Sequence, residues 1–126
     1  VFKMHFQLIK DDFYNNILGK IEYYFPSFHS VFDKEDGIYL ILGELGSFIL
    51  NNFHRKEIEK ATIAFINEAI ELGGSETQDV MILQLFQQFY ENEYITDDMR
   101  KGLKSKSLAL FDKSFEEYKS FYNLNQ

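Results

Sequence analysis

Carboxylates are the side chains in this sequence best able to do chemistry, and they are concentrated in one stretch. Residues 64–99 carry eight of them and no Lys, Arg or His. Like charges three or four residues apart on a helix repel, and neighbouring cations normally offset that repulsion. A solvated face is one interpretation of this pattern, and a surface that attracts a basic partner is the other. The residues expected to contact such a partner are the carboxylates with two tyrosine anchors: Glu68, Glu71, Glu76, Asp79, Tyr90, Glu91, Glu93, Tyr94, Asp97 and Asp98.

Glu44 is the candidate for acid–base chemistry, because it interrupts the apolar segment "IYLILGELGSFIL". A carboxyl group in a cleft often has a perturbed pKa, which suits proton transfer. Gly43, Gly46 and Ser47 would either leave a pocket beside Glu44 or allow a second helix to pack closely. We expect close packing.

Other chemistries lack the residues they need. The chain has no cysteine, and His5, His29 and His54 have none of the spacings of paired metal ligands. The segment "DKEDG" places its glycine at position five of a calcium loop rather than six. No Gly-x-Ser-x-Gly motif is present. We therefore expect no metal, no cofactor and no enzymatic activity.

Two short segments could bind phosphate or nucleic acid. Gly73 and Gly74 would need a preceding strand and a cation to cradle phosphate, so a corner between helices is favoured. There Gly73 is expected at a helix end with positive φ, followed by a capping box of Ser75 and Gln78. The segment "RKGLKSK", residues 100–106, holds four cations, but the net charge of −7 argues against nucleic-acid binding. We expect a solvated connector.

Apolar residues recur at three- and four-residue steps, which predicts an all-α fold in one domain over residues 1–126. Helices are expected at 3–24, 38–53, 55–72, 75–92 and 105–122, with a loop at 26–37 and a short helix or turn after residue 92. The result is a five- or six-helix bundle with helix 38–53 the most buried. The inward positions are predicted to include Phe6, Ile9, Phe13, Ile17, Ile21, Tyr24, Ile58, Ala61 or Thr62, Phe65, Ala69, Leu72, Val80, Leu83, Phe86, Phe89, Tyr90, Leu108, Phe111, Phe115, Tyr118 and Tyr122. Tyr90 is thus expected both in the core, by its spacing, and in the partner surface, as an anchor.

A weak internal echo pairs "LGELGSFILNNF" with "ILQLFQQFYENE" at an offset of 40 residues. It aligns Leu45 with Leu85 and Ile49 with Phe89. That offset is typical of HEAT-like paired-helix repeats, although any two amphipathic helices can give a similar echo.

The segments "PSFHSVF", "YLILGELGSFI" and "FINEAIELGGSETQDVMILQLFQQFYEN" together resemble small all-helical bacterial immunity proteins of polymorphic and contact-dependent toxin systems. Pro26, Gly43, Phe65, Glu68 and Gly73 lie where that pattern places them. The resemblance covers about residues 25–122 and implies a protein that neutralises a cognate toxin. The acidic stretch leads us to expect a basic surface on that toxin. We expect a cytoplasmic location because the N-terminal residues lack a signal-peptide pattern and the longest apolar run is too short to span a bilayer. The resemblance brings no site residues with it, and it implies neither a membrane nor a nucleic-acid partner. The alternatives are a small-molecule-binding or enzymatic domain using a pocket around Glu44, and a regulatory adaptor.

Overall fold

The computed structural model describes residues 11–123, which form helices and connecting turns without any strand. The all-α prediction is confirmed, whereas the count of five or six helices is not matched because two predicted helices are subdivided. The elements in chain order are α2 (Asp12–Asn15), α3 (Ile17–Tyr24), the 3₁₀-helix η1 (Lys34–Asp36), α4 (Ile38–Asn52), α5 (Lys56–Leu72), α6 (Ser75–Val80), the π-helix η2 (Met81–Phe86), α7 (Gln87–Tyr90), α8 (Glu93–Gly102) and α9 (Ser105–Asn123).

The predicted helix 3–24 is interrupted. Its first part, with Phe6 and Ile9, lies outside the described residues, and the remainder is divided into α2 and α3 at Asn16. The Asn16 side-chain amide donates to the carbonyl oxygen of Asp12 at 2.9 Å. An asparagine that bonds to nearby backbone competes with the regular helix, which explains the break.

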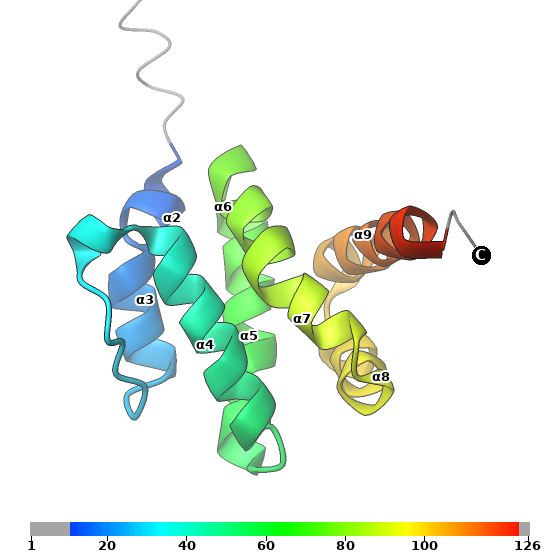
Figure 1. The fold of residues 1–126 in the computed structure, drawn as a ribbon, viewed down its shortest axis with the longest axis horizontal. Coiled ribbons are helices and arrows are strands. Elements are labelled where there is room, and N and C mark those ends of the chain that lie inside the picture. Colours follow the sequence, from blue (N-terminus) through cyan, green and yellow to red (C-terminus); the bar gives the residue numbers. More distant parts are fainter. Residues whose placement is uncertain (1–10, 124–126) are drawn as a thin grey trace, which may run out of the picture.

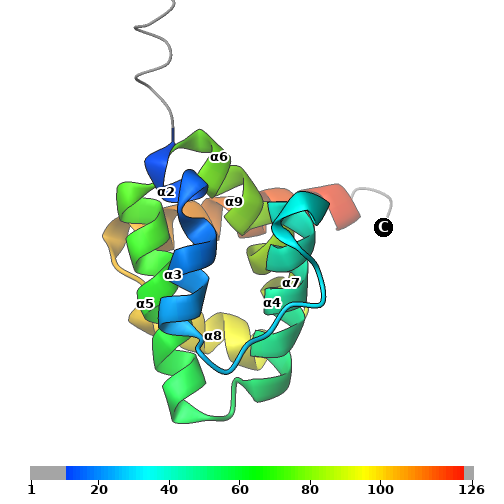
Figure 2. The ribbon, with the colours of Figure 1, turned by 90° about the vertical axis from the view of Figure 1, so that its left-hand side faces the viewer.

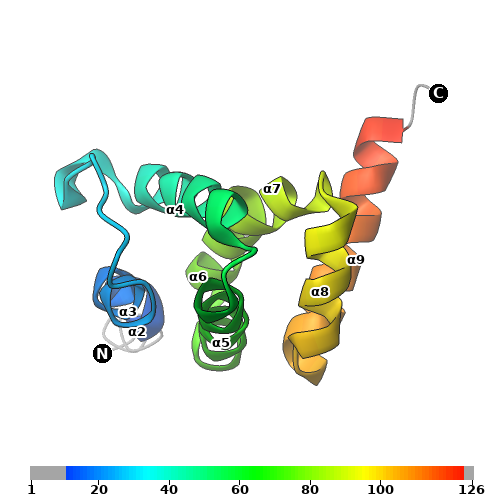
Figure 3. The same cartoon turned by 90° about the horizontal axis from the view of Figure 1, so that it is seen from below.

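The helices form two layers, as Figure 3 shows from below. α3 packs against α5 in one layer, while α4 packs against the η2–α7 region in the other. α4 and α5 are joined by a short turn and run in opposite directions (Figures 1 and 2). α8 and α9 follow at one end of the molecule, where α7 contacts both.

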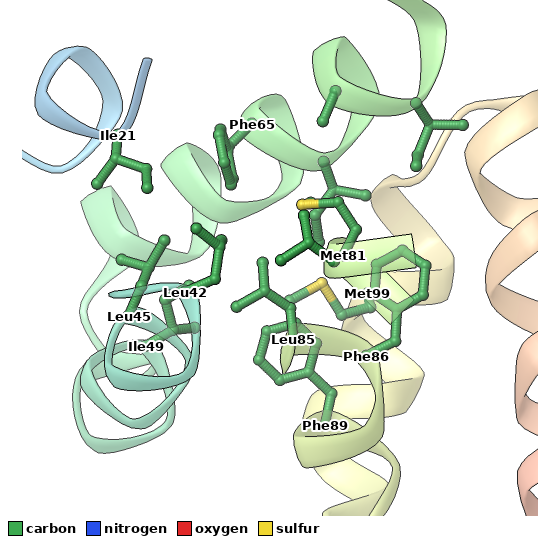
Figure 4. Packing of buried hydrophobic residues seen from close by; sticks show 14 of the residues in the cluster. Ile21, Leu42, Leu45, Ile49, Phe65, Met81, Leu85, Phe86, Phe89 and Met99 are labelled. Carbon is green, nitrogen blue, oxygen red and sulfur yellow. The ribbon is translucent and has the colours of Figure 1, made fainter. Parts of the chain in front are cut away.

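The centre of the molecule is the helical rod from α6 through η2 to α7. Its elements contact α2, α4, α5, α8 and α9, so it meets neighbours along its whole length. Figure 4 shows Leu42, Leu45 and Ile49 of α4 in the core together with Met81 and Leu85 of the rod. The expectation that helix 38–53 is the most buried is therefore wrong. The start of α4 lies at the surface, with Leu40 half exposed.

The π-helix η2 changes which side chains of the rod point inward. The buried side chains step by five residues, from Val80 to Leu85 and from Met81 to Phe86. Such a step is the wide turn of a π-helix, because after Thr77, Val80 and Met81 a regular α-helix would place residue 84 inward. Leu83 lies on the outer side of this turn and is 49% exposed, which corrects its predicted burial. Two other predicted core residues, Leu72 at the end of α5 and Tyr122 near the end of α9, are also exposed.

Gly43 and Gly46 of α4 allow the rod to approach closely, as expected. A Cβ atom on Gly43 would lie 2.8 Å from Gln84 Oε1, and one on Gly46 would lie 3.0 Å from the Gln84 carbonyl oxygen. The Gln88 side chain donates to the Gly43 carbonyl oxygen at 3.1 Å across this contact. The echoed residues Leu45, Ile49, Leu85 and Phe89 are all buried in α4 and the rod, and repeat ancestry stays a prediction.

The glycine corner differs from its prediction in two respects. Gly73 has a φ of −82°, so it needs no left-handed conformation, and the residue that does have positive φ is Gly37. Gly73 is required by space instead, because a Cβ atom there would lie 2.5 Å from the Thr77 Cβ atom. Ser75 makes no capping bond, since Gly74 occupies the N-cap position of α6.

Asp11 provides the missing cap from a distant part of the chain. Its carboxylate accepts hydrogen bonds from the Thr77 N–H at 2.7 Å and the Thr77 hydroxyl at 2.9 Å. It also accepts the Tyr14 N–H at 3.0 Å, so one side chain caps both α2 and α6. Within residues 11–123, no helix is both long and apolar enough to cross a membrane.

Candidate partner-binding surface

The predicted acidic surface is divided by the fold into separate groups. Glu76 and Glu91 lie near opposite ends of the rod, fifteen residues and therefore about 22 Å apart along its axis. Glu68 and Glu71 belong to α5, and the remaining acidic residues surround α8. The sequence stretch is continuous, but it does not produce one face.

Glu68 is used internally, contrary to the expectation that it is free for a partner. One of its oxygens lies 2.5 Å from Lys20 Nζ, and the other accepts a hydrogen bond from the Tyr24 hydroxyl. The hydrogen bonds from Lys20 and Tyr24 lower the pKa of the Glu68 carboxyl. The bond to Glu68, aided by burial, raises the pKa of Tyr24 to about 12. These contacts join α3 to α5. The cation that neutralises Glu68 is Lys20, which lies outside the acidic stretch of residues 64–99.

Tyr90 is a core residue and not an exposed anchor. Its side chain is only 5% exposed, its ring stacks on Phe115 with 4.6 Å between centroids, and its hydroxyl donates to the Phe111 carbonyl oxygen at 2.8 Å. Burial raises the pKa of the Tyr90 hydroxyl. Its predicted inward position is confirmed, its expected role as a partner anchor is corrected, and the ring holds α9 against α7.

Glu71, Glu76 and Asp79 are exposed, but they lie in two different places on the surface. Glu71 borders a groove that also includes Lys104 and Lys106 at the start of α9, so cations oppose its charge. Burial raises the pKa of Tyr39, and the nearby charges of Asp79 and Glu76 add to that effect. These two carboxylates occupy the end of the rod remote from α8.

The remaining predicted residues gather around α8 and define what we call the α8 face: Glu91, Glu93, Tyr94, Asp97 and Asp98. Glu91, Glu93, Tyr94 and Asp97 are exposed, with the Tyr94 side chain 66% accessible. Among the described residues, no cation forms an ion pair with Glu91, Glu93 or Asp97 at 4 Å or less. Asp98 lies 3.8 Å from Lys101.

The inner side of α8 fixes this face in place. Ile95, Thr96 and Met99 are buried, and the Thr96 hydroxyl donates to the Phe89 carbonyl oxygen at 2.8 Å. The Asn92 side chain caps the helix by accepting the Ile95 N–H at 3.1 Å. Arg100 joins α8 to α9 through both oxygens of Asp112, at 2.8 and 3.0 Å. A short helix attached at its start, middle and end holds its outer residues in defined positions.

The basic segment 100–106 is partly used for structure. Arg100 is paired with Asp112, and the Asn67 side chain accepts the Lys104 N–H at 2.9 Å. A Cβ atom on Gly102 would lie 2.6 Å from the Ile63 side chain, so this turn packs closely on α5. The segment therefore connects α8 to α9, as the sequence indicates.

Glu44 has a structural contact. Both of its oxygens face the Val31 N–H, at 3.1 and 3.2 Å, so the carboxylate holds the loop between α3 and α4. Its neighbours Gly43 and Gly46 serve helix packing, as described above. In the part of the chain that the structure describes, no three His, Asp or Glu side chains gather as metal ligands would.

Comparisons with protein-family models, with curated proteins and with solved structures found no match for this chain.

Proposed function

We propose that this protein is a non-enzymatic binding protein that neutralises a cognate toxin with a basic surface, and that the α8 face is its contact surface. The observation that supports the proposal best is a rigidly held helix whose outer side offers exposed carboxylates around an exposed tyrosine. Tyrosine at the centre of a polar surface is a common anchor in protein interfaces.

The charge of the face suits a basic partner. Carboxylates at the rim of an interface mainly accelerate encounter, while a central aromatic ring contributes to the lifetime of the complex. Because α8 is already fixed by its capping bond, its buried residues and Arg100, binding would not incur the cost of ordering it.

The sequence resemblance to immunity proteins directs the choice of partner. A toxin that acts on nucleic acid must bind phosphate and therefore carries Lys and Arg around its active site. An acidic inhibitor that covers such a surface blocks substrate access without any chemistry of its own.

The test is co-expression with the C-terminal domain of a large secreted protein encoded directly upstream of this gene. This chain should restore growth to cells that produce the domain, and Tyr94→Ala combined with Asp97→Lys should abolish the rescue. Glu76→Lys combined with Asp79→Lys, which adds cations at the far end of the rod, is the matched control and should leave rescue intact.

Failure of the wild-type chain to rescue, or the absence of any such upstream protein, contradicts the proposal and favours an adaptor for another host protein.

A further inference from the structure

An aromatic chain leads from the core of the molecule to its surface beside the α8 face. Phe86 packs edge-on against Phe111, which contacts Tyr90, and Tyr90 contacts Tyr118 with 5.4 Å between ring centroids. Tyr118 in turn lies 4.6 Å from Tyr122. The chain begins with a fully buried ring and ends with Tyr122, which is 58% exposed. The outer rings are thus held by the core although they face solvent.

A pocket of about 440 Å³ lies beside these outer rings. It is lined by Leu83, Gln87, Gln88, Glu91, Tyr118 and Tyr122. Its wall therefore combines two aromatic rings, two amides and one carboxylate, and it contains no cation. Leu83 reaches this wall because it lies on the outer side of η2.

The charge in the pocket is negative and lacks a partner among the described residues. Glu91 forms no ion pair there, and after burial its charge is the strongest influence that raises the pKa of Tyr118. A carboxylate and two aromatic rings in one pocket together create a negative potential that favours a cation. A neighbouring ring on the same side of α9 already binds a cation, because Lys119 Nζ lies 4.6 Å from the centre of the Phe115 ring.

We propose that this pocket binds an arginine side chain of the protein partner, with the guanidinium stacked on Tyr118 and Tyr122 and paired with Glu91. Arginine fits better than lysine because its planar group stacks on aromatic rings while it donates two parallel hydrogen bonds to a carboxylate. This inference rests on the proposed function, since it names the anchor that a basic partner would insert next to the α8 face.

The test uses N-acetyl-arginine N-methylamide as the probe and its neutral citrulline counterpart as the control ligand. In a heteronuclear NMR titration, the arginine probe should shift the backbone signals of Glu91, Tyr118 and Tyr122 with a dissociation constant on the order of millimolar. The citrulline probe should shift them far less. Equal shifts with both probes would overturn the assignment, because they would show that charge has no part in binding.

Two variants identify the interacting groups. Glu91→Gln keeps the shape of the side chain and should weaken arginine binding about fivefold, as expected for the loss of one partly exposed ion pair. Tyr122→Leu should weaken it about two- to fivefold through the loss of the ring. Glu93→Gln, two residues away on the α8 face, is the matched control and should have no effect. A loss in Glu93→Gln as large as that in Glu91→Gln would contradict a specific pocket.

The arginine titration and the growth rescue together distinguish failure of the pocket from failure of the proposed function. Arginine binding without rescue from the neighbouring toxin domain would support the pocket and contradict the toxin as its partner. Rescue that survives the combined Glu91→Gln and Tyr122→Leu substitutions would support the function and overturn the pocket as the anchor site.

Discussion

Asp11 holds the N-termini of two helices with one carboxylate, at a position that no local pattern identifies. Burial disfavours its ionised form, but the N–H groups of Thr77 and Tyr14 outweigh that effect and lower the pKa of Asp11 below its ordinary value. A carboxyl whose pKa is lowered by folding stabilises the folded state above its unfolded pKa, which is about 3.9. That contribution is lost as the pH falls through the lower, folded value.

We therefore expect Asp11→Ala to lower the free energy of unfolding by about 2 kcal/mol near neutral pH, because two helices lose a charged cap. The difference between wild type and variant should shrink as the pH falls below about 4. Urea unfolding between pH 3 and pH 7 measures both effects. A difference that stays constant across this range would show that the charge of Asp11 is not what stabilises the corner.

Tyr90 and Tyr94 offer a second comparison at the scale of single residues. Tyr90→Phe removes the hydroxyl that donates to the Phe111 carbonyl oxygen and should reduce stability by about 1 kcal/mol without changing partner binding. Tyr94→Ala should leave stability unchanged and weaken partner binding, since that side chain is 66% exposed. Thermal unfolding and a partner-binding assay on both variants distinguish a core role from an anchor role. The reverse result would restore Tyr90 as a contact residue.

At the scale of elements, the extents of α4, α5 and α9 follow from the sequence because each has a long apolar stripe with regular spacing. The breaks do not follow from the apolar stripes. The interruption at Asn16 comes from a local side-chain bond to the Asp12 carbonyl oxygen, which competes with the regular helix. The cap of α6 comes from Asp11, which is far away in sequence. The surface, too, has some features that follow from the sequence and others that do not. The exposure of Glu93 and Asp97 agrees with the charge pattern, but the pattern does not separate them from Glu68, which Lys20 neutralises from a helix far away in sequence.

The π-helix makes a prediction that belongs to the element as a whole. A π-helix holds an extra residue relative to an α-helix, so deleting the exposed Leu83 should convert the wide turn to a regular one while preserving the faces on either side. Deleting Ala64, an exposed residue of the regular helix α5, should instead rotate every later side chain of that helix by about 100°. The Leu83 deletion should therefore retain a cooperative thermal transition and the Ala64 deletion should lose it. Equal damage from both deletions would show that the π geometry itself is required.

At the scale of the whole molecule, the net charge of −7 and the position of the charges act over different distances. Net charge attracts any basic protein from far away, whereas the α8 face acts only where it meets its partner. Two double variants separate these effects because each changes the net charge equally. Glu93→Lys with Asp97→Lys alters the α8 face, and Glu76→Lys with Asp79→Lys alters the other end of the rod. The two pairs occupy similar helix positions. Glu76 and Glu93 lie in the first turn of α6 and α8, and Asp79 and Asp97 follow about one turn later.

At low ionic strength, both double variants should bind the partner more slowly than wild type, because both weaken the long-range attraction. At about 0.15 M salt the Debye length is only about 8 Å, so charges at the far end of the rod no longer reach the interface. We then expect the Glu76 and Asp79 variant to recover the wild-type association rate, while the Glu93 and Asp97 variant remains slow. Stopped-flow association rates measured across a salt series provide the comparison. If the two variants stay alike at every salt concentration, the attraction depends on net charge alone, and the partner does not bind at α8.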